Sequence, residues 1–309
     1  MALKYRKRVV LAKVESSYGV DVSPVGANAI LARGLTITPM AGETVKRGLI
    51  KPTLGNEPEI HVGTHVEVGI EVELAGAGSA GGVPGWGVLL QGCGFSETVS
   101  AGVDCHYKPV SSGEKSLTIH FHLDGQKHAL VGCRGSVKLS VDTKKAPGLE
   151  FTFLGLWVDP ASVADPTPDF SSFQTPVPVS NVTTPTLDIH GYSAVAYALN
   201  IDMGIKVVHQ DLINYAGVDI LDRAPSGSLK IQAPPLSSKN FFAIAKAETT
   251  GPLAFEHGTA SGNIVRIDCP KVQLLKPAYG DQDGAATMTL GLSLMATDTG
   301  DDEITITSK

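Results

Sequence analysis

The sequence predicts a mainly β protein made of two tandem β-sandwiches. Three observations support this prediction. Apolar and polar residues alternate with period two through much of the chain, helical signals are few and short, and a proline-rich stretch divides the chain near its middle. The chain has 309 residues, 42% of them hydrophobic, so it is long enough to bury a sizeable core, and its length suggests about two domains.

Strands are predicted wherever the alternation is sustained and turn residues flank it. In residues 66–74 the five apolar residues share one face, and Glu67, Glu71 and Glu73 lie on the other. The same reasoning predicts strands at 116–123, 136–141, 149–157, 227–232, 264–267, 272–275, 287–295 and 304–307. Asp124-Gly125, Pro147-Gly148 and Asp283-Gly284 mark turns between strands.

Two short helices are predicted. Residues 84–93 begin with Pro84 and end at glycines, which is the usual start and stop asymmetry of a helix. Residues 238–248 begin with Ser238 as a candidate N-cap and end before a Thr-Thr-Gly-Pro turn.

A connector and an internal repeat define the expected domains. Residues 160–185 contain six prolines, which cannot donate to a sheet ladder, so we expect an extended connector. The expected division is a first sandwich over 1–160, a connector over 161–185 and a second sandwich over 186–309.

The order of motifs repeats across the connector. Residues 35–38 correspond to 199–202, 151–156 to 289–294, and Cys133 to Cys269. The spacing shortens once, which predicts about 25 fewer residues after the second helix. Chance similarity among β-strands is the alternative explanation of the repeat.

Charge and cysteine content exclude several protein classes. The net charge of −6 argues against nucleic-acid binding through a basic patch. Residues 1–159 hold 16 Lys and Arg against 15 Asp and Glu, whereas residues 160–309 hold 9 against 16. The four cysteines form no C-x-x-C pair, so buried thiols are expected. There is no 18-residue apolar run and no signal-peptide pattern, and synthesis in a cytoplasm is expected.

Candidate chemistry is sparse. His120, His122 and His128 could approach a zinc ion, but no fourth ligand has a suggestive spacing, and hydrogen-bonded strand histidines are the simpler interpretation. Asp281, Asp283 and Gly284 resemble the start of a calcium loop without its bidentate Glu, so a hairpin turn is favoured. We therefore expect no enzyme, no catalytic residue, no metal and no cofactor.

Several motifs together resemble the tail tube proteins (major tail proteins) of bacteriophages with long non-contractile tails. The resemblance rests on the segments 12–21, 35–39 with Glu43 and Arg47, 66–78, 84–95 and 132–137. They cover most of residues 10–160, and the second half matches through the internal repeat. The resemblance is to pattern and order and includes no catalytic signature.

The resemblance implies two tail-tube-type β-sandwich or barrel folds, each with one short helix, that contribute strands to an inner ring β-barrel. Rings would stack into a hollow siphovirus tail tube around the tape measure protein. The tube would conduct double-stranded DNA during genome ejection without sequence-specific binding. Further implied partners are the tail terminator and distal tail proteins. The implied location is the virion tail, after synthesis in the bacterial host cytoplasm and with no membrane association.

Three groups of residues are expected to serve assembly. Glu67, Glu71 and Glu73 would line the lumen, since an acidic wall does not retain DNA. Arg6, Lys7 and Arg8 would form N-terminal arm contacts with a neighbour, although a basic tail is more often simply solvated. Two excursions, 43–64 and 207–226, are long for connections inside a compact domain and are expected to be inter-subunit or inter-ring loops. Their candidate contact residues are Glu43, Arg47, Leu49, Lys51, Glu57, Asp211, Tyr215, Asp222 and Arg223.

Two questions stay open at the level of the sequence. Two sandwiches per chain predict trimeric, pseudo-hexameric rings, whereas a hexamer with an outward second half is the rival. The alternative function is another virion β-protein, such as a fibre or receptor-binding module. A lectin or carbohydrate-active enzyme is a third class, but the aromatic content of only 6% does not favour it.

Overall fold

The computed structural model describes residues 2–309. In the first half the elements are β1 (Arg8–Val14), η1 (Gly26–Asn28), β2 (Ala29–Ile30), β3 (Ala32–Val45), β4 (Ile60–Glu73), α1 (Gly87–Gly92), β5 (Phe95–Ser100), β6 (Asp104–Pro109), β7 (Leu117–Leu123), β8 (Gln126–Asp142), β9 (Gly148–Trp157) and β10 (Ala161–Ser162).

The second half is also composed mainly of strands. Its elements are β11 (Thr186–Ile189), β12 (Tyr192–Ser193), β13 (Ala196–Asp202), β14 (Ile205–Leu212), β15 (Tyr215–Arg223), β16 (Ser226–Gln232), α2 (Phe241–Lys246), β17 (Thr250–His257), β18 (Val265–Gln282), β19 (Ala285–Met295) and β20 (Thr305–Ser308). The predicted β class and both short helices are confirmed.

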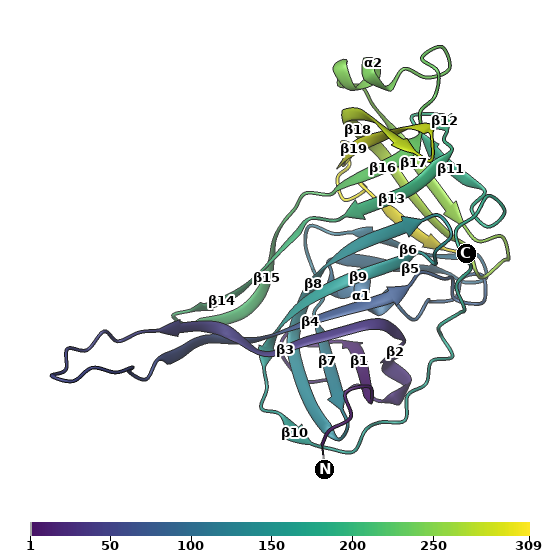
Figure 1. Cartoon of the computed structure of the whole chain (residues 1–309). Helices are drawn as coiled ribbons and strands as arrows, with labels where there is room; N and C mark the ends of the chain where they lie inside the picture. The colour runs from purple at the N-terminus through teal and green to yellow at the C-terminus, as the bar shows by residue number, and fades with distance from the viewer. Residues whose placement is uncertain (1) are drawn as a thin grey trace.

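One antiparallel sheet runs through both halves, and we call it the central sheet (Figure 1). Its strand order is β3-β4-β9-β8-β13-β16-β19-β18. The halves meet where β8 pairs with β13, from Lys138 opposite Asp202 to Asp142 opposite Ala198. We call this junction the seam.

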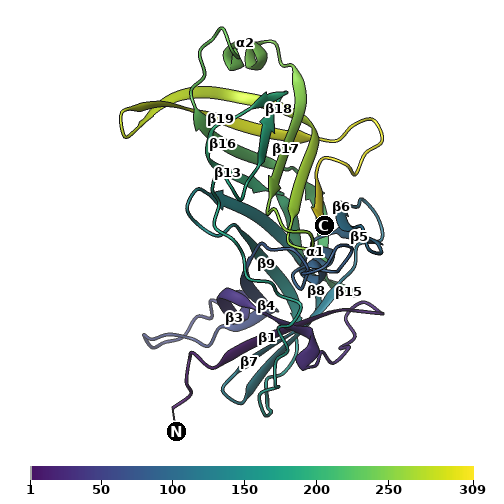
Figure 2. The same ribbon diagram turned by 90° about the vertical axis from the view of Figure 1, so that its right-hand side faces the viewer.

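Each half closes its core with further strands beside this central sheet (Figure 2). In the first half β1 pairs with β7, and β7 pairs with the beginning of β8. In the second half β11 pairs with β17, and β17 pairs with the beginning of β18. The long strands β8 and β18 therefore each connect two groups of strands.

The alternation predicted for residues 66–74 is confirmed. The apolar side chains from Val66 to Leu74 at alternate positions are all buried, while Glu67, Glu71 and Glu73 lie on the opposite face. The buried face packs against Trp86, Leu89 and Leu90 at helix α1 and against Phe151 and Phe153 of β9. Burial of these apolar surfaces, not helix propensity, stabilises a helix as short as α1.

The two halves repeat the same pairing pattern, and two of their bulges lie at corresponding positions. In β3–β4 the ladder is irregular between Ala32 and Gly34, and in β13–β16 it is irregular between Ala196 and Ala198. A second bulge recurs where β7 meets β8 and where β17 meets β18. Since bulges interrupt a ladder at specific residues, they fix the correspondence between the halves.

The β5–β6 hairpin accounts for the change of spacing that the sequence predicts. It lies between α1 and β7, whereas α2 leads to β17 without any comparable hairpin. Strand β6 pairs with β20, so this extra hairpin connects the first half to the end of the chain.

The registers correct two details of the repeat. Pairing through β4 and β16 makes Phe151 equivalent to Leu290, not to Thr289, because the buried positions must match. The bulge in β8 and β18 makes Cys133 equivalent to Val272, so the Cys133–Cys269 match is out of register. The cysteine mismatch has a physical cause, because an extra residue at a bulge shifts every position beyond it.

Two further expectations are corrected. The two strands predicted at 264–267 and 272–275 are one strand, β18, which continues through Pro270, and β17 contains Pro252. Both prolines lie at the β17–β18 bulge, where ladder hydrogen bonds are interrupted and proline is tolerated. The excursion at 207–226 is a β-hairpin formed by β14 and β15, whereas in 43–64 only the two ends pair with each other, as parts of β3 and β4, and residues 46–59 form an irregular tip.

The proline-rich segment runs along the outside of the first half to the second (Figure 1). Asp169 N–H donates to the Gly26 carbonyl, and Phe173 packs against the backbone at Gly85. Further on, near the seam, the Lys144 N–H donates to the Val179 carbonyl and the Val179 N–H donates to the Lys145 carbonyl. The connector is thus held at several points and does not form a free linker.

Leu199→Ala should lower the free energy of unfolding by about 2–5 kcal/mol, because Leu199 is fully buried at the seam. Leu35→Ala, at the corresponding position of the half-buried outer edge of β3, should cost less than half as much in the unassembled chain. Urea denaturation of both variants measures this difference, and equal losses would contradict the assignment.

Candidate assembly surfaces

The polar face of the central sheet carries the three predicted glutamates. The register places Glu67, Gly69, Glu71 and Glu73 of β4 opposite alternate residues of β9 from Leu154 to Gly148. The ladder continues across β8, β13 and β16, and the side chains on the same face are those of Ser136, Lys138, Ser140, Asn200, Asp202, Ser226, Ser228 and Lys230. The face is therefore hydrophilic from one half to the other.

Several charges on this face are paired. Arg33 Nη2 lies 2.6 Å from Glu71 Oε1, and Lys138 Nζ lies 2.9 Å from Asp202 Oδ2 across the seam. Glu67 is exposed and lies 3.6 Å from the imidazole of His65. Such exposed pairs stabilise a fold by about 0–1 kcal/mol each, so their main effect is on the potential of the surface.

The β3–β4 hairpin extends away from the body and ends in an apolar tip (Figure 1). Lys51 Nζ lies 3.1 Å from Glu57 Oε1, and the N–H of Leu49 donates to Glu57, so three predicted contact residues hold the tip together. Ile50 and Leu54 are fully exposed there. Glu43 and Arg47 are also exposed. The prediction that these residues contact a neighbour stays a prediction.

The corresponding β14–β15 hairpin leaves on the same side but lies against the first half of its own chain (Figure 1). The N–H of Val218 donates to Tyr18 Oη at 2.6 Å, and Arg134 Nη1 donates to the Val218 carbonyl at 2.9 Å and to Asp219 at 3.0 Å. The Arg134 guanidinium also covers the Tyr18 ring at 5.0 Å.

Titratable groups at this contact have shifted pKa values. The hydrogen bond to Asp219 raises the pKa of Tyr215 to about 12, with burial acting in the same direction. Burial lowers the pKa of His209, whose ring stacks on that of His65 at 4.7 Å, and the nearby His65 lowers it further. At neutral pH this contact therefore contains an uncharged His209 imidazole and a protonated Tyr215 phenol.

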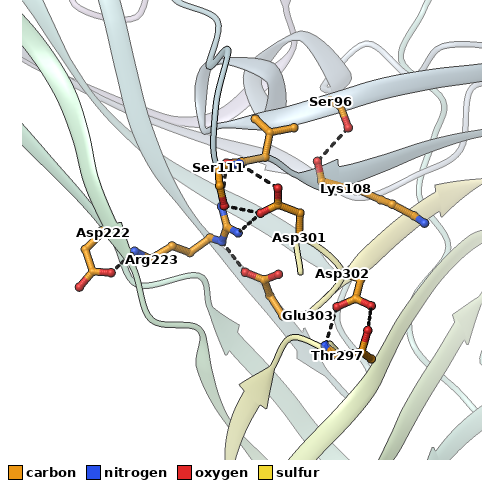
Figure 3. Close-up of polar contacts among 10 residues, drawn as sticks. Ser96, Lys108, Ser111, Asp222, Arg223, Thr297, Asp301, Asp302 and Glu303 are labelled. Carbon is orange, nitrogen blue, oxygen red and sulfur yellow. Dashed lines mark hydrogen bonds and ion pairs between the residues drawn. The ribbon is translucent and has the colours of Figure 1, made fainter. Parts of the chain in front are cut away.

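Arg223 connects β15 to the C-terminal segment and to the first half (Figure 3). Its guanidinium lies 3.0 Å from Asp301, pairs with Glu303 and donates to the Val110 carbonyl at 2.9 Å. Ser111 also binds Asp301. Asp222 accepts from the N–H of Arg223, and Asp211 is exposed on β14. Arg223 thus has a clear role inside the chain, and its predicted inter-subunit contact is untested.

The N-terminal arm contacts its own chain. Lys7 pairs with Asp124, which raises the pKa of the Lys7 amine, and its Nζ lies 3.7 Å from Asp165. Arg8 Nη1 donates to the Leu35 carbonyl of β3 at 2.7 Å, and its guanidinium covers the Tyr5 ring. Arg6 is exposed.

The predicted histidine group does not converge on a metal. His120 Nε2 lies 3.0 Å from Asp21, and the ring of His128 packs edge-on against Phe121. Within residues 2–309 no group of three or more His, Cys, Asp or Glu side chains is arranged to hold a metal ion. Neither helix of the described chain is long and apolar enough to cross a membrane.

Sequence reasoning missed the contact formed by Arg134, Tyr18 and Asp219. Arg134 belongs to the Gly-Cys-Arg-Gly motif at 132–135, and Tyr18 follows the Glu-Ser-Ser motif at 15–17, so both stood out in the sequence. Their shared partner Val218 is 84 residues from Arg134 and 200 residues from Tyr18 along the chain, and only folding brings the three together.

Comparison with known proteins gives one family. The family model described as "Phage tail tube protein" matches residues 6–306, which is nearly the whole chain and both halves. The curated proteins gave no significant match.

Arg134→Ala should loosen the β14–β15 hairpin without unfolding the protein. It removes charge-assisted hydrogen bonds to Val218 and Asp219, a loss of about 1–3 kcal/mol, so amide exchange in residues 215–220 should accelerate roughly tenfold to a hundredfold. Lys145→Ala, which removes an exposed pair with Asp142, is the matched control and should leave this exchange unchanged. Unchanged exchange in the Arg134 variant would show that the contact does not hold the hairpin.

Proposed function

The chain belongs to the phage tail tube protein family, a family of structural and non-enzymatic tail components, and from this premise we propose how it builds a tube. The protein assembles into rings that stack into the hollow tail tube. The tube encloses the tape measure protein during assembly, adjoins the tail terminator and distal tail proteins, and conducts double-stranded DNA at ejection. These partners are inferred from the family-level resemblance.

The observation that carries the proposal is the continuous central sheet. It joins both halves through the seam and has one buried apolar face and one hydrophilic face. A sheet of this kind can form part of a closed wall, because it needs water or solute on only one side. In the proposed ring the hydrophilic face, with Glu67, Glu71 and Glu73, faces the lumen.

Three copies per ring follow from two equivalent halves per chain. The halves share strand order and two bulge positions, so each would act as one tail-tube-type fold and occupy one of six similar places in a ring. A hexameric ring with the second half as an outward decoration is the rival. The seam supports the trimer, because it joins both halves into one continuous sheet.

Negative-stain microscopy of the purified protein tests the proposal. Stacked rings or tubes are expected, and a population of unassociated molecules under all assembly conditions would contradict a tube. The mass of one ring separates the two stoichiometries, at about 97 kDa for three copies of the 32.2 kDa chain and about 193 kDa for six. Six chains per ring would exclude the trimer.

An acidic lumen should speed DNA passage. Double-stranded DNA carries one negative charge per about 1.7 Å, so Glu67→Lys with Glu73→Lys should permit assembly but slow DNA ejection. Glu71 is left in place because it pairs with Arg33. Glu248→Lys, an exposed change next to α2, is the control. Ejection as fast as the control would refute the lumen assignment.

The apolar tip of the β3–β4 hairpin should serve assembly and not folding. Deleting residues 49–57 removes the exposed Ile50 and Leu54 and no core side chain. The free energy of unfolding of the monomer should therefore change by no more than about 0.5 kcal/mol. Tubes should fail to form. Normal tubes from this variant, seen by microscopy, would rule out the hairpin as an assembly element.

A further inference from the structure

The central sheet has two open edges within the described chain. Strand β3 pairs with β4 on one side only, and β18 beyond Gln273 pairs with β19 on one side only. Leu35 on the open β3 edge is half-buried, and Tyr279 on the open β18 edge is 61% exposed. Open edges with apolar side chains favour pairing with another chain.

The repeat shows that these two edges correspond to the two strands of the seam. The correspondence is found by counting along the paired strands from the matched bulges. Leu35 of β3 corresponds to Leu199 of β13, and Tyr279 of β18 corresponds to Leu139 of β8. Leu199 and Leu139 are buried, at 0% and 5% exposure, because in the seam each strand covers the other.

The seam therefore gives a register for pairing between copies. In the seam Leu199 lies opposite Val141, and Asp202 lies opposite Lys138. The same register on the open edges sets Leu35 opposite Asp281 and Thr38 opposite Ala278.

Beside each of these edges lies a hollow, and the two hollows are lined by corresponding residues. The hollow at the seam, about 520 Å³, is lined by Leu187, Val195, Tyr197 and Leu199, and the end of β8 with Val141 forms one wall. The hollow at the β3 edge, about 290 Å³, is lined by the corresponding Val10, Leu31, Arg33 and Leu35, with Arg6 and Arg8 in addition. Within residues 2–309 no strand takes the place beside this hollow that the end of β8 takes beside the hollow at the seam.

The charges at the two open edges are complementary. The end of β18 and its turn carry Asp281 and Asp283, both exposed. Arg8 binds the Leu35 carbonyl, which the register places opposite Asp281, and Arg6 lines the same hollow. In the seam the corresponding position is the buried Val141 in a mostly apolar hollow. Where the open edges would meet, Asp281 would face Arg6 and Arg8, whereas the corresponding contact in the seam is the apolar one made by Val141.

We infer that the β18–β19 turn of one copy docks in the Arg6–Arg8 hollow of the next, with β18 paired to the open edge of β3 in the register of the seam. This inference rests on the proposed ring and names its subunit contact. The β8–β9 turn carries Lys144 and Lys145, which the arginines repel, and Asp281 would be desolvated in the apolar hollow. Each turn therefore fits its own hollow better than the other, and pairing of β18 with β3 of the next copy makes the halves alternate around the ring.

Disulfide cross-linking tests the register. Opposed residues of an antiparallel ladder have Cα atoms about 4.5–5.5 Å apart, within disulfide range. Thr38→Cys with Ala278→Cys should link neighbouring copies of the assembled protein, giving a ladder of covalent oligomers that ends at one closed ring. Lys138→Cys with Asp202→Cys is the positive control and should link within one chain. Thr38→Cys with Gln282→Cys, displaced along the strand, should not link. The four native cysteines are buried.

Charge exchange tests the docking of the turn. Arg8→Asp and Asp281→Arg should each raise the concentration needed for assembly by about tenfold or more, as expected when an interfacial charge loses its partner. The double variant Arg8→Asp with Asp281→Arg should recover assembly, and this recovery cannot come from a folding defect. Circular dichroism of each monomer checks that it remains folded.

The outcomes separate this inference from the proposed function. The inferred contact would be wrong if rings or tubes form but the Thr38–Ala278 link does not, or if charge exchange gives no recovery of assembly. Either result would leave the proposed function of the protein standing. Absence of any ring from the unmodified protein would overturn both. A cross-link in the expected register together with recovery by charge exchange would support the inference.

Discussion

The structure depends on one constraint, which is that the polar backbone groups at a sheet edge need partners. At the seam, the edges of β8 and β13 satisfy each other, and this pairing joins two repeated halves into one sheet. The central sheet can then bury one face continuously, from Val68 and Phe151 in the first half to Leu229 and Leu290 in the second. The hydrophilic face, the position of the hairpins and the open outer edges all follow from this junction.

The halves keep the same backbone and differ in side-chain chemistry. At the first bulge Arg33 pairs with Glu71, whereas the corresponding Tyr197 lies against Lys230, with the amine 5.5 Å from the ring centroid. Both contacts hold a bulged residue against the neighbouring strand, one by charge and one by a cation–π interaction. Such differences distinguish the halves without changing the ladder, so a chain with a repeated fold can still present two different edges.

The two hairpins differ in the same way as the two kinds of strand edge. One packs against its own chain, and the other exposes apolar side chains. The β14–β15 hairpin is held by Arg134 and Tyr18 and ends near the junction formed by Arg223 with Asp301 and Glu303. The β3–β4 hairpin contacts β14 through the stacked rings of His65 and His209 and has pairs within its own tip, where the apolar side chains Ile50 and Leu54 are exposed. In a family of tube-forming proteins, an exposed apolar tip of this kind is consistent with the assembly role that we propose for it.

The sequence by itself determined the β class, the core face of β4, the two short helices, the repeat and the place where the halves differ in length. These features depend on local periodicity and turn chemistry, as at Asp124-Gly125 and Asp283-Gly284, where positive φ angles form the expected turns. Only the tertiary structure decided the repeat register, the continuity of β17 and β18 through prolines, and the partners of Arg134, Arg223 and Arg8. A bulge shifts register without a signal in the alternation, and a pairing between residues far apart in the chain depends on which edges meet.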